Sequence, residues 1–465
     1  MGHFVKGFVP TPSDVVSLMV SKLFGGRAPG SGASVLDPGC GNGEFIAGIL
    51  RACTANGWPV PRIVGVELDP VRAATASRQF RQVPQVEIRH ADFLRPTNET
   101  FDFVIGNPPY VAITGLSPAE RLEYRSAYRT ASGRFDLYAL FFEQALRLLA
   151  PRGRLVFITP EKFLYVESAR PLREILRRHH VEELHFASEA TFSERVTYPL
   201  ISTVSTAGGN ILTRVIRRTG SVSNVVIATA ASWQPMIEGF VATASTAMTT
   251  LADVALRVSC GVATGADSVF VVPTAELSPE LNRFAHPTLS GRQILPSHEL
   301  VLSSSLLAPY GSDGRLLPES QLGALGRFLA EPQRRRQLEG RTCIDRKPWY
   351  AFHDNLPLGE MLRPKLLCKD ITEEPFFVVD HGGYLVPRHS VYYVVPADPA
   401  DLEPLARYLN SDVARAWLRA HCQRAANGFI RLQSHVLKQL PVPLQFQSRV
   451  ERLKVGSPQA ELLPV

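Results

Sequence analysis

Short apolar runs alternate with helical stretches through the first half of the chain. We predict a strand at Val35–Asp37 and, directly after it, a helix that begins at Glu44 and extends to Leu50. Further strands are predicted at Ile63–Glu67, Val86–Arg89, Phe103–Gly106, Leu155–Thr159, Val181–Phe186, Ile201–Ser205 and Ile211–Arg217, and a further helix at Leu137–Leu149. Strands that alternate with helices favour an α/β fold with a doubly wound, mostly parallel sheet.

The end of this series predicts a different strand direction. Only the short segment Thr206–Asn210 separates the last two predicted strands. A connection that short can join antiparallel strands but not parallel ones. We therefore expect an antiparallel hairpin at this edge of the sheet.

The pattern changes after about Ser232. The stretch Ala242–Thr250 is rich in Ala, Ser and Thr and is expected to be a linker or the first turn of a second domain. The remaining sequence is proline-rich and has no repeated strand–helix unit. A chain of 465 residues is long enough for two cores. We therefore expect an α/β domain over residues 1–240 and an α+β domain over residues 241–465.

Composition excludes several classes of protein. The six cysteines show no CxxC spacing and the twelve histidines no HExxH cluster, so neither a metal site nor a disulfide framework is expected. No apolar run is long enough to cross a bilayer and no signal peptide is evident, so a cytoplasmic location away from membranes is expected. The net charge of +7 suits a polyanionic partner such as nucleic acid.

A glycine-rich turn joins the first predicted strand to its helix, in the sequence DPGCGNGEF from Asp37 to Phe45. Glycines here allow a ligand to approach the backbone closely. The carboxylate of Asp37, placed before the glycines, suits a cationic amino-acid group better than a pyrophosphate. This arrangement favours S-adenosylmethionine (AdoMet) over a nicotinamide dinucleotide as the cofactor.

Acidic residues also end the next two strands. Glu67 can accept hydrogen bonds from both hydroxyls of a ribose, and Asp92 can accept one from an adenine amino group while Phe93 packs on the ring. Taken singly, each acidic residue would be interpreted as a charged loop residue that is exposed to solvent. Three acids at successive strand ends indicate a ligand site, because ligands bind at that edge of open α/β sheets.

The sequence Asn107-Pro108-Pro109-Tyr110 follows the fourth strand. Two oxygen acceptors, the Asn107 side chain and the Pro108 carbonyl, would hold both N–H bonds of a conjugated exocyclic amine and stabilise the charge that grows as a methyl group arrives. The prolines fix the backbone, and Tyr110 offers a flat face to an extruded base. We therefore expect methyl transfer to an amino group by direct in-line displacement, which leaves S-adenosylhomocysteine.

With these motifs in this order, the chain resembles the TaqI-type (gamma-class) DNA adenine-N6 methyltransferases. The resemblance begins near Phe8–Pro12 and includes DPGCGNGEF, VGVELDP, ADFL, GNPPY and the segment Gly133–Tyr138. It reaches the second half in Leu289–Arg292 and Tyr408–Ser411, and it is weaker there.

The resemblance implies a class I AdoMet methyltransferase fold in residues 1–240 and a target-recognition domain in residues 241–465, with double-stranded DNA as the substrate. It implies cofactor contacts from Thr11, Asp37, Gly39, Glu67, Leu68, Asp92, Phe93, Asn107 and Phe141. It also implies that the flipped base lies between Tyr110 and Phe192, a residue that composition and spacing alone would assign to the core.

Three rival classes remain open. Enzymes that methylate RNA or a protein glutamine can use the same NPPY chemistry, and cytosine-N4 methyltransferases more often have Ser or Asp at the position of Asn107. The third is a catalytically silent nucleic-acid-binding subunit, which the intact Asp37, Glu67 and Asn107 argue against. The large second domain favours duplex DNA.

Neither base contacts nor the target sequence can be assigned from one chain. The basic stretches of the second half are candidates for DNA contacts, although each could equally be a solvated face: Arg334–Arg336, Arg346–Tyr350, Arg363–Lys365 and Lys369. No acidic-x-Lys sequence, the pattern typical of many nuclease active sites, occurs in a context that would support a nuclease. We therefore expect a monomeric modification enzyme that is paired with a separately encoded restriction endonuclease.

Overall fold

The computed structural model describes residues 9–192, 198–206, 212–227, 229–239, 248–425 and 428–447. Phe8, most of the connection 206–210 and much of the predicted linker 242–250 lie outside the described residues. The chain divides into two compact units, residues 1–241 and residues 242–465.

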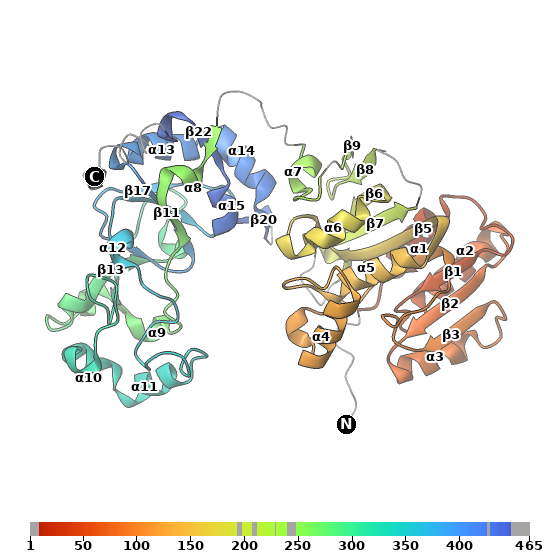
Figure 1. Cartoon of the computed structure of the whole chain (residues 1–465), viewed down its shortest axis with the longest axis horizontal. Coiled ribbons are helices and arrows are strands. Elements are labelled where there is room, and N and C mark those ends of the chain that lie inside the picture. Colours follow the sequence, from red (N-terminus) through yellow and green to blue (C-terminus); the bar gives the residue numbers. More distant parts are fainter. Residues whose placement is uncertain are drawn as a thin grey trace, which may run out of the picture. The chain divides into compact units, whose positions relative to one another are not determined.

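The first unit is built on one nine-stranded sheet with the order β3-β2-β1-β4-β5-β7-β6-β8-β9 (Figure 1). Its strands are β1 Ser34–Asp37, β2 Arg62–Glu67, β3 Val86–His90, β4 Phe101–Gly106, β5 Leu149–Pro160, β6 His180–Phe186, β7 Pro199–Ser205, β8 Thr213–Ile216 and β9 Val222–Val225. Its helices are α1 Ser13–Phe24, α2 Glu44–Asn56, α3 Pro70–Phe80, α4 Pro118–Ala127, α5 Leu137–Arg147, α6 Arg170–Leu176 and α7 Gln234–Ile237.

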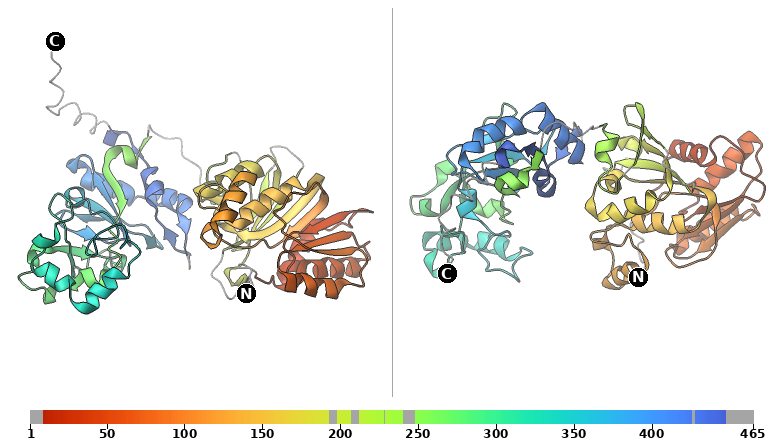
Figure 2. Two further views of the ribbon diagram at one scale, coloured as in Figure 1. Left: turned by 60° about the horizontal axis from the view of Figure 1, so that its bottom comes forward. Right: turned by 45° about the horizontal axis from the view of Figure 1, so that its top comes forward.

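Successive residues of the central strands point into two different cores. Val35 and Ile105 pack with α1, α2 and α3, whereas their neighbours Leu36 and Val104 pack with α5 and α6. Figure 2 shows the sheet between its helices. Because both faces are covered, the central strands are almost wholly apolar. The predicted doubly wound, mostly parallel sheet is confirmed.

We predicted a hairpin between the strands near residues 201–205 and 211–217, and this prediction is wrong because the two strands do not pair with each other. β7 lies between β5 and β6 and is antiparallel to both, and β8 pairs in parallel with β6. β7 and β8 therefore run in opposite directions but are not neighbours. The antiparallel hairpin at the edge is formed by β8 and β9. We predicted no strand at Val222–Val225, which forms β9.

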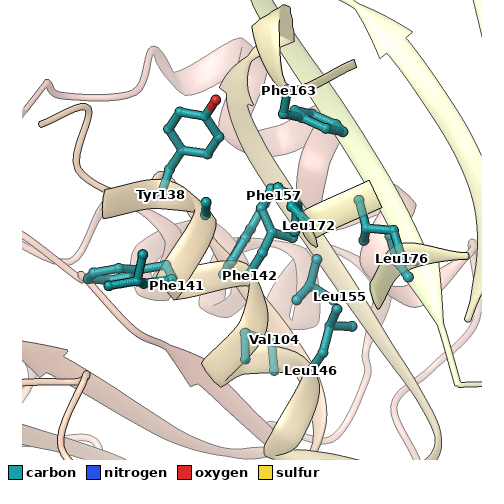
Figure 3. Close-up of a cluster of buried hydrophobic side chains, with 14 of the residues drawn as sticks. Val104, Tyr138, Phe141, Phe142, Leu146, Leu155, Phe157, Phe163, Leu172 and Leu176 are labelled. Carbon is teal, nitrogen blue, oxygen red and sulfur yellow. The ribbon is translucent and has the colours of Figure 1, made fainter. Parts of the chain in front are cut away.

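The larger core of the first unit lies under α5. The rings of Phe142 and Phe157 meet edge to face with their centroids 5.0 Å apart, and Phe163 continues the cluster. Figure 3 shows Phe141 projecting from α5 on a different side from this group. Phe141 belongs to the same buried cluster, but its ring meets that of Phe93.

The second unit is an α+β structure, as expected. Two four-stranded sheets have the orders β11-β19-β15-β17 and β12-β14-β13-β18, and shorter sheets join β10 to β22 and β16 to β21 and β20. Its strands are β10 Met248–Thr250, β11 Ala255–Cys260, β12 Val271–Pro273, β13 Ala285–Leu289, β14 Ser304–Leu307, β15 Lys365–Lys369, β16 Ile371–Thr372, β17 Val378–Asp380, β18 Val386–Pro387, β19 Val391–Pro396, β20 Gln423–Arg424, β21 Ile430–Arg431 and β22 Pro441–Pro443. Its helices are α8 Leu251–Val254, α9 Asp267–Phe270, α10 Ala324–Leu329, α11 Pro332–Glu339, α12 Leu358–Met361, α13 Leu402–Leu409, α14 Asp412–His421 and α15 Ser434–Lys438.

A buried ion pair joins two strands of this unit. The Lys365 ammonium lies 2.5 Å from the Asp380 carboxylate, and both side chains are almost completely buried. Asp380 also accepts hydrogen bonds from the amides of Gly383 and Leu385, so it shapes the turn after β17. Burial lowers the pKa of Lys365, and Asp380 opposes that effect.

We predict that Lys365→Met destabilises the second unit by about 3–5 kcal/mol, because it leaves the Asp380 carboxylate buried without its cation. Chemical denaturation of the full chain measures this effect. The same substitution at exposed Lys438 is the matched control and should change stability by less than about 0.5 kcal/mol. Equal behaviour of the two variants would contradict the structural role of the pair.

Candidate active site

A pocket with an empty volume of about 850 Å3 opens at the carboxyl ends of the central strands. Residues from the ends of β2, β3 and β4, from the glycine-rich turn and from α5 line it. Eight of the nine predicted cofactor residues are among them: Thr11, Gly39, Glu67, Leu68, Asp92, Phe93, Asn107 and Phe141. The fold therefore brings together groups that are up to about 130 positions apart in the chain.

The glycine-rich turn is tied to the end of β2. The Gly41 amide donates to one oxygen of Glu67 over 2.9 Å, and the Asp69 amide donates to the other over 2.8 Å. Gly43 has φ of 96°, and a Cβ at this position would overlap the Phe80 ring. Only glycine fits there, so this residue sets the angle at which the chain enters α2.

Asp37, the ninth predicted cofactor residue, is not among the residues that line the pocket. Its side chain is completely buried behind the turn, and neither oxygen has a hydrogen-bond partner in good geometry among the described residues. Burial raises the pKa of Asp37 well above its ordinary value, and the charges of Glu44 and Glu67 raise it further. A nearby cation would relieve this unfavourable state of the carboxylate.

The opposite wall of the pocket is apolar. The rings of Phe93 and Phe141 are tilted by 45° with their centroids 5.0 Å apart. Beside them, Asp92 accepts a hydrogen bond from the Leu94 amide over 2.9 Å, which fixes the carboxylate next to the rings. The combination of acid and aromatic walls suits a ligand that carries both a charged group and a flat heterocycle.

The Asn107 side chain has a defined orientation. Its amide nitrogen donates to the Val9 carbonyl and to the Thr11 hydroxyl oxygen, each over 3.2 Å. The Val9 carbonyl can only accept, so the nitrogen of the carboxamide must face it. The Asn107 Oδ1 atom is left buried and without a hydrogen-bond partner among the described residues.

The loop that carries Asn107 is held by the segment before α5. The Leu137 amide donates to the Val111 carbonyl over 2.9 Å, and the Ile113 amide donates to the Phe135 carbonyl over 3.0 Å. The Tyr110 hydroxyl donates to the Ile158 carbonyl at the end of β5 over 3.2 Å. These bonds explain why Gly133–Tyr138 accompanies the NPPY sequence in the chain.

Tyr110 and Phe192 are brought together but not as two walls of an open slot. Their rings meet edge to face at 86°, with the centroids 6.5 Å apart. Phe192 is 5% exposed and belongs to the apolar core on the α1–α3 face. Pro108 is also buried. In this conformation a flat base does not fit between the two rings, and Asn107 Oδ1 is shielded from solvent.

The sequence did not indicate several residues that line the pocket. Tyr124, on the exposed helix α4, is the clearest example. Arg72 on α3 also lines it and forms an ion pair with Glu67 over 3.4 Å. No local motif marks these positions, since each reaches the pocket through the packing of a helix.

The described residues fit AdoMet. The unsatisfied buried carboxylate of Asp37 matches its positive charge, Glu67 and Asp92 offer acceptors for its ribose and adenine, and the aromatic wall matches its adenine ring. Within the described ranges, no three His, Cys, Asp or Glu side chains gather as a metal-binding group. Nor does any described helix have the length and apolar character needed to cross a membrane.

Two protein-family models match the chain. The Eco57I restriction-modification methylase matches residues 66–192, and the TaqI-like C-terminal specificity domain matches residues 328–442. The first match extends from the end of β2 to Phe192 and includes the NPPY sequence, α5 and β6. The second covers about half of the second unit. Both units of the chain therefore have a counterpart in the same group of enzymes.

Known proteins are similar over most of the chain. The Type II methyltransferase M.PaeR7I of Pseudomonas aeruginosa is 27% identical over 95% of this chain and 86% of its own length. M.XhoI of Xanthomonas vasicola is 29% identical over 76% of this chain and 70% of its own length. Among solved structures, the type IIG restriction endonuclease BpuSI is 14% identical with a TM-score of 0.47, over 97% of this chain and 61% of that one.

The nine-stranded sheet and the acidic pocket at its carboxyl edge define a class I AdoMet-dependent methyltransferase, and AdoMet is the methyl donor. The matches to both units then point to one group of enzymes. The chain is similar to the TaqI-type methyltransferases of Type II restriction-modification systems.

We predict opposite effects of Asp37→Asn on stability and on AdoMet binding. The folded-state pKa of Asp37 is raised, so its contribution to stability is greatest below the unfolded pKa of about 3.9 and is lost as pH rises through the folded pKa. The substitution should therefore raise the Tm of the cofactor-free protein at alkaline pH. It should also weaken AdoMet binding by about tenfold or more, because a favourable charge is removed.

Titration calorimetry in buffers of different ionisation enthalpy provides a second readout. AdoMet should lower the pKa of Asp37, so the wild type should release a proton on binding at a pH near that pKa, and Asp37→Asn should not. Asp345→Asn, an exposed change in the second unit, is the control. Unaltered proton release in Asp37→Asn would contradict this account.

Proposed function

We propose that this enzyme transfers the methyl group of AdoMet to the N6 amino group of adenine in duplex DNA. The orientation of the Asn107 carboxamide carries the proposal. Its nitrogen is engaged by Val9 and Thr11, and its oxygen is unpaired beside the cofactor pocket. An unpaired buried acceptor costs about 1–3 kcal/mol, and a substrate N–H bond would remove that cost.

The chemistry needs two acceptors because the amine has two protons. The Asn107 Oδ1 atom and the Pro108 carbonyl would hold the N–H bonds so that the nitrogen lone pair faces the methyl group. AdoMet supplies a methyl group on a sulfonium, and direct in-line transfer to the amine leaves S-adenosylhomocysteine. The amine then loses one proton, and the chain needs no covalent intermediate.

The target base must leave the helical stack to reach this site. Tyr110 offers its ring for stacking and is anchored through its hydroxyl to β5. Since Tyr110 and Phe192 touch edge to face, the Phe192 ring must move before both can contact the two faces of a base. We propose that entry of the base drives this movement and uncovers Asn107 Oδ1.

The two units would have different functions. Residues 1–240 would bind AdoMet and perform the transfer, and residues 241–465 would recognise the target sequence. The match of residues 328–442 to a specificity domain supports this division. We further propose that the enzyme acts as a monomer and protects host DNA alongside a separately encoded endonuclease.

Product analysis tests the assignment directly. The full chain is incubated with methyl-labelled AdoMet and duplex DNA, and the DNA is digested to nucleosides for mass spectrometry. N6-methyladenine is the expected product. N4-methylcytosine would overturn the choice of base, and label that enters only RNA or protein would overturn the choice of DNA.

We predict that Asn107→Ala lowers the methylation rate by about 100-fold or more, because one of two acceptors for the reacting amine is lost. AdoMet affinity should change far less, since Asn107 forms only part of the pocket wall. Asn98→Ala, which removes an exposed asparagine of the same unit, should leave both quantities unchanged. If Asn107→Ala keeps the wild-type rate, the proposed mechanism is wrong.

Extrusion of the target base can be measured separately from methyl transfer. We predict that 2-aminopurine at the target adenine becomes more fluorescent when the enzyme and AdoMet bind, because the base leaves the stack. Tyr110→Ala should alter this signal and weaken binding of the extruded base by about 1–3 kcal/mol. Unchanged fluorescence with wild-type enzyme at saturating concentration would rule out base flipping.

A further inference from the structure

A second concave site lies in the C-terminal unit, at the meeting of three segments. Ser290 and Arg292 come from the turn after β13, Lys369 and Asp370 from the end of β15, and Arg388 and Ser390 from the connection between β18 and β19. These residues are far apart in the sequence. Their convergence in one pocket is therefore a property of the fold.

Ser390 holds the three segments together. Its hydroxyl oxygen accepts a hydrogen bond from the Gly291 amide over 2.9 Å, and its carbonyl accepts one from the Asp370 amide over 3.0 Å. A Cβ at position 291 would lie only 2.9 Å from the Ser390 carbonyl oxygen, so the close approach requires glycine. The floor of the site is thus fixed without a ligand.

Two cations in this site form no ion pair or side-chain hydrogen bond within the part of the chain that the structure describes. Arg388 forms an ion pair with Asp267 over 3.1 Å, and Asp370 lies 3.9 Å from Arg431. In contrast, Arg292 and Lys369 form no ion pair or side-chain hydrogen bond with any described residue, although Lys369 is partly buried. His389 also lines the site and adds charge only when protonated. The local balance is therefore positive and uncompensated.

Other basic side chains of this unit are already engaged within the protein. Arg334 lies over the Phe328 ring at 3.6 Å, and Arg335 lies over the Trp349 ring at 3.7 Å. Lys347 donates to the carbonyls of Phe352 and His353, and Lys365 pairs with Asp380. Several of the basic stretches that the sequence singled out are thus structural. Lys369 differs from them because it faces an open site beside Arg292.

We propose that this site binds one or two phosphates of the DNA backbone. Arg292 and Lys369 would supply the positive charge, and the Ser390 hydroxyl, whose oxygen already accepts from Gly291, can donate its own proton to a phosphate oxygen. Contacts of this kind fix the register of the protein on the duplex and carry no sequence information. The inference rests on the proposed function, because it takes duplex DNA as the ligand.

The salt dependence of DNA binding tests the inference in the full chain. Each phosphate contact contributes about 0.9 to the slope of log Kd against log salt. The double variant Arg292→Ala/Lys369→Ala should bind duplex DNA about 10- to 100-fold more weakly at low salt, with a slope reduced by about 1–2. Its AdoMet affinity and its Tm should match the wild type, because neither side chain forms an ion pair or hydrogen bond with a described residue.

The matched control removes the same charge elsewhere in the unit. Arg315 and Arg327 are 89% and 74% exposed and pair with Asp313 and Glu280. Arg315→Ala/Arg327→Ala should therefore leave the slope close to that of the wild type. A slope for the Arg292/Lys369 variant equal to that of this control would overturn the phosphate site. An unchanged slope with an altered target preference would also overturn it, because it would indicate base reading.

The outcomes separate this inference from the proposed function. The Arg292/Lys369 variant should form the same methylated nucleoside as the wild type, with a raised KM for DNA and an unchanged kcat at saturating DNA. If the product is N6-methyladenine and the slope does not move, the phosphate site alone is wrong. If the slope moves as expected but the product is another base, the phosphate site stands and the adenine assignment fails.

Discussion

The proposed reaction depends on the direction of one carboxamide. Asn107 stands at the end of β4, where a parallel strand delivers it to the same edge as the cofactor pocket. Its nitrogen is bound by Val9 and Thr11, so its oxygen has only one direction in which to face. The N-terminal segment, the glycine-rich turn and the NPPY loop are thus coupled through a single side chain. Without that coupling the amide could rotate and present a donor, which would repel an amine.

The sequence predicts most of the first unit because its signals are local. Apolar strands followed by Asp37, Glu67 and Asp92 define the carboxyl edge of a parallel sheet, and the structure places eight predicted residues around one pocket. The strand order at the far edge could not be read in the same way. β7 inserts between β5 and β6 because of packing over the whole sheet, and a short connection says nothing about which strands become neighbours.

The sequence also could not predict the residues whose positions depend on tertiary packing. Tyr124 reaches the pocket from a helix whose own residues are largely exposed, and Asp37 lies behind the pocket instead of in its wall. In the second unit, runs of basic residues in the sequence did not predict which cations are available to a ligand. Arg334 and Arg335 lie over aromatic rings, whereas Arg292 and Lys369, from separate segments, share one site. A cation's partner depends on the fold more than on its neighbours in the chain.

The acidic character of the cofactor pocket has a consequence for turnover. Glu67 and Asp92 line the pocket and Asp37 lies buried near it, so we expect a negative field around a ligand that would enter with a sulfonium and leave as an uncharged thioether. Methyl transfer therefore removes part of the attraction that held the ligand in place. For this electrostatic reason we expect the spent cofactor to leave the pocket more readily than the donor. The same carboxylates that attract the donor would then favour its replacement for another cycle.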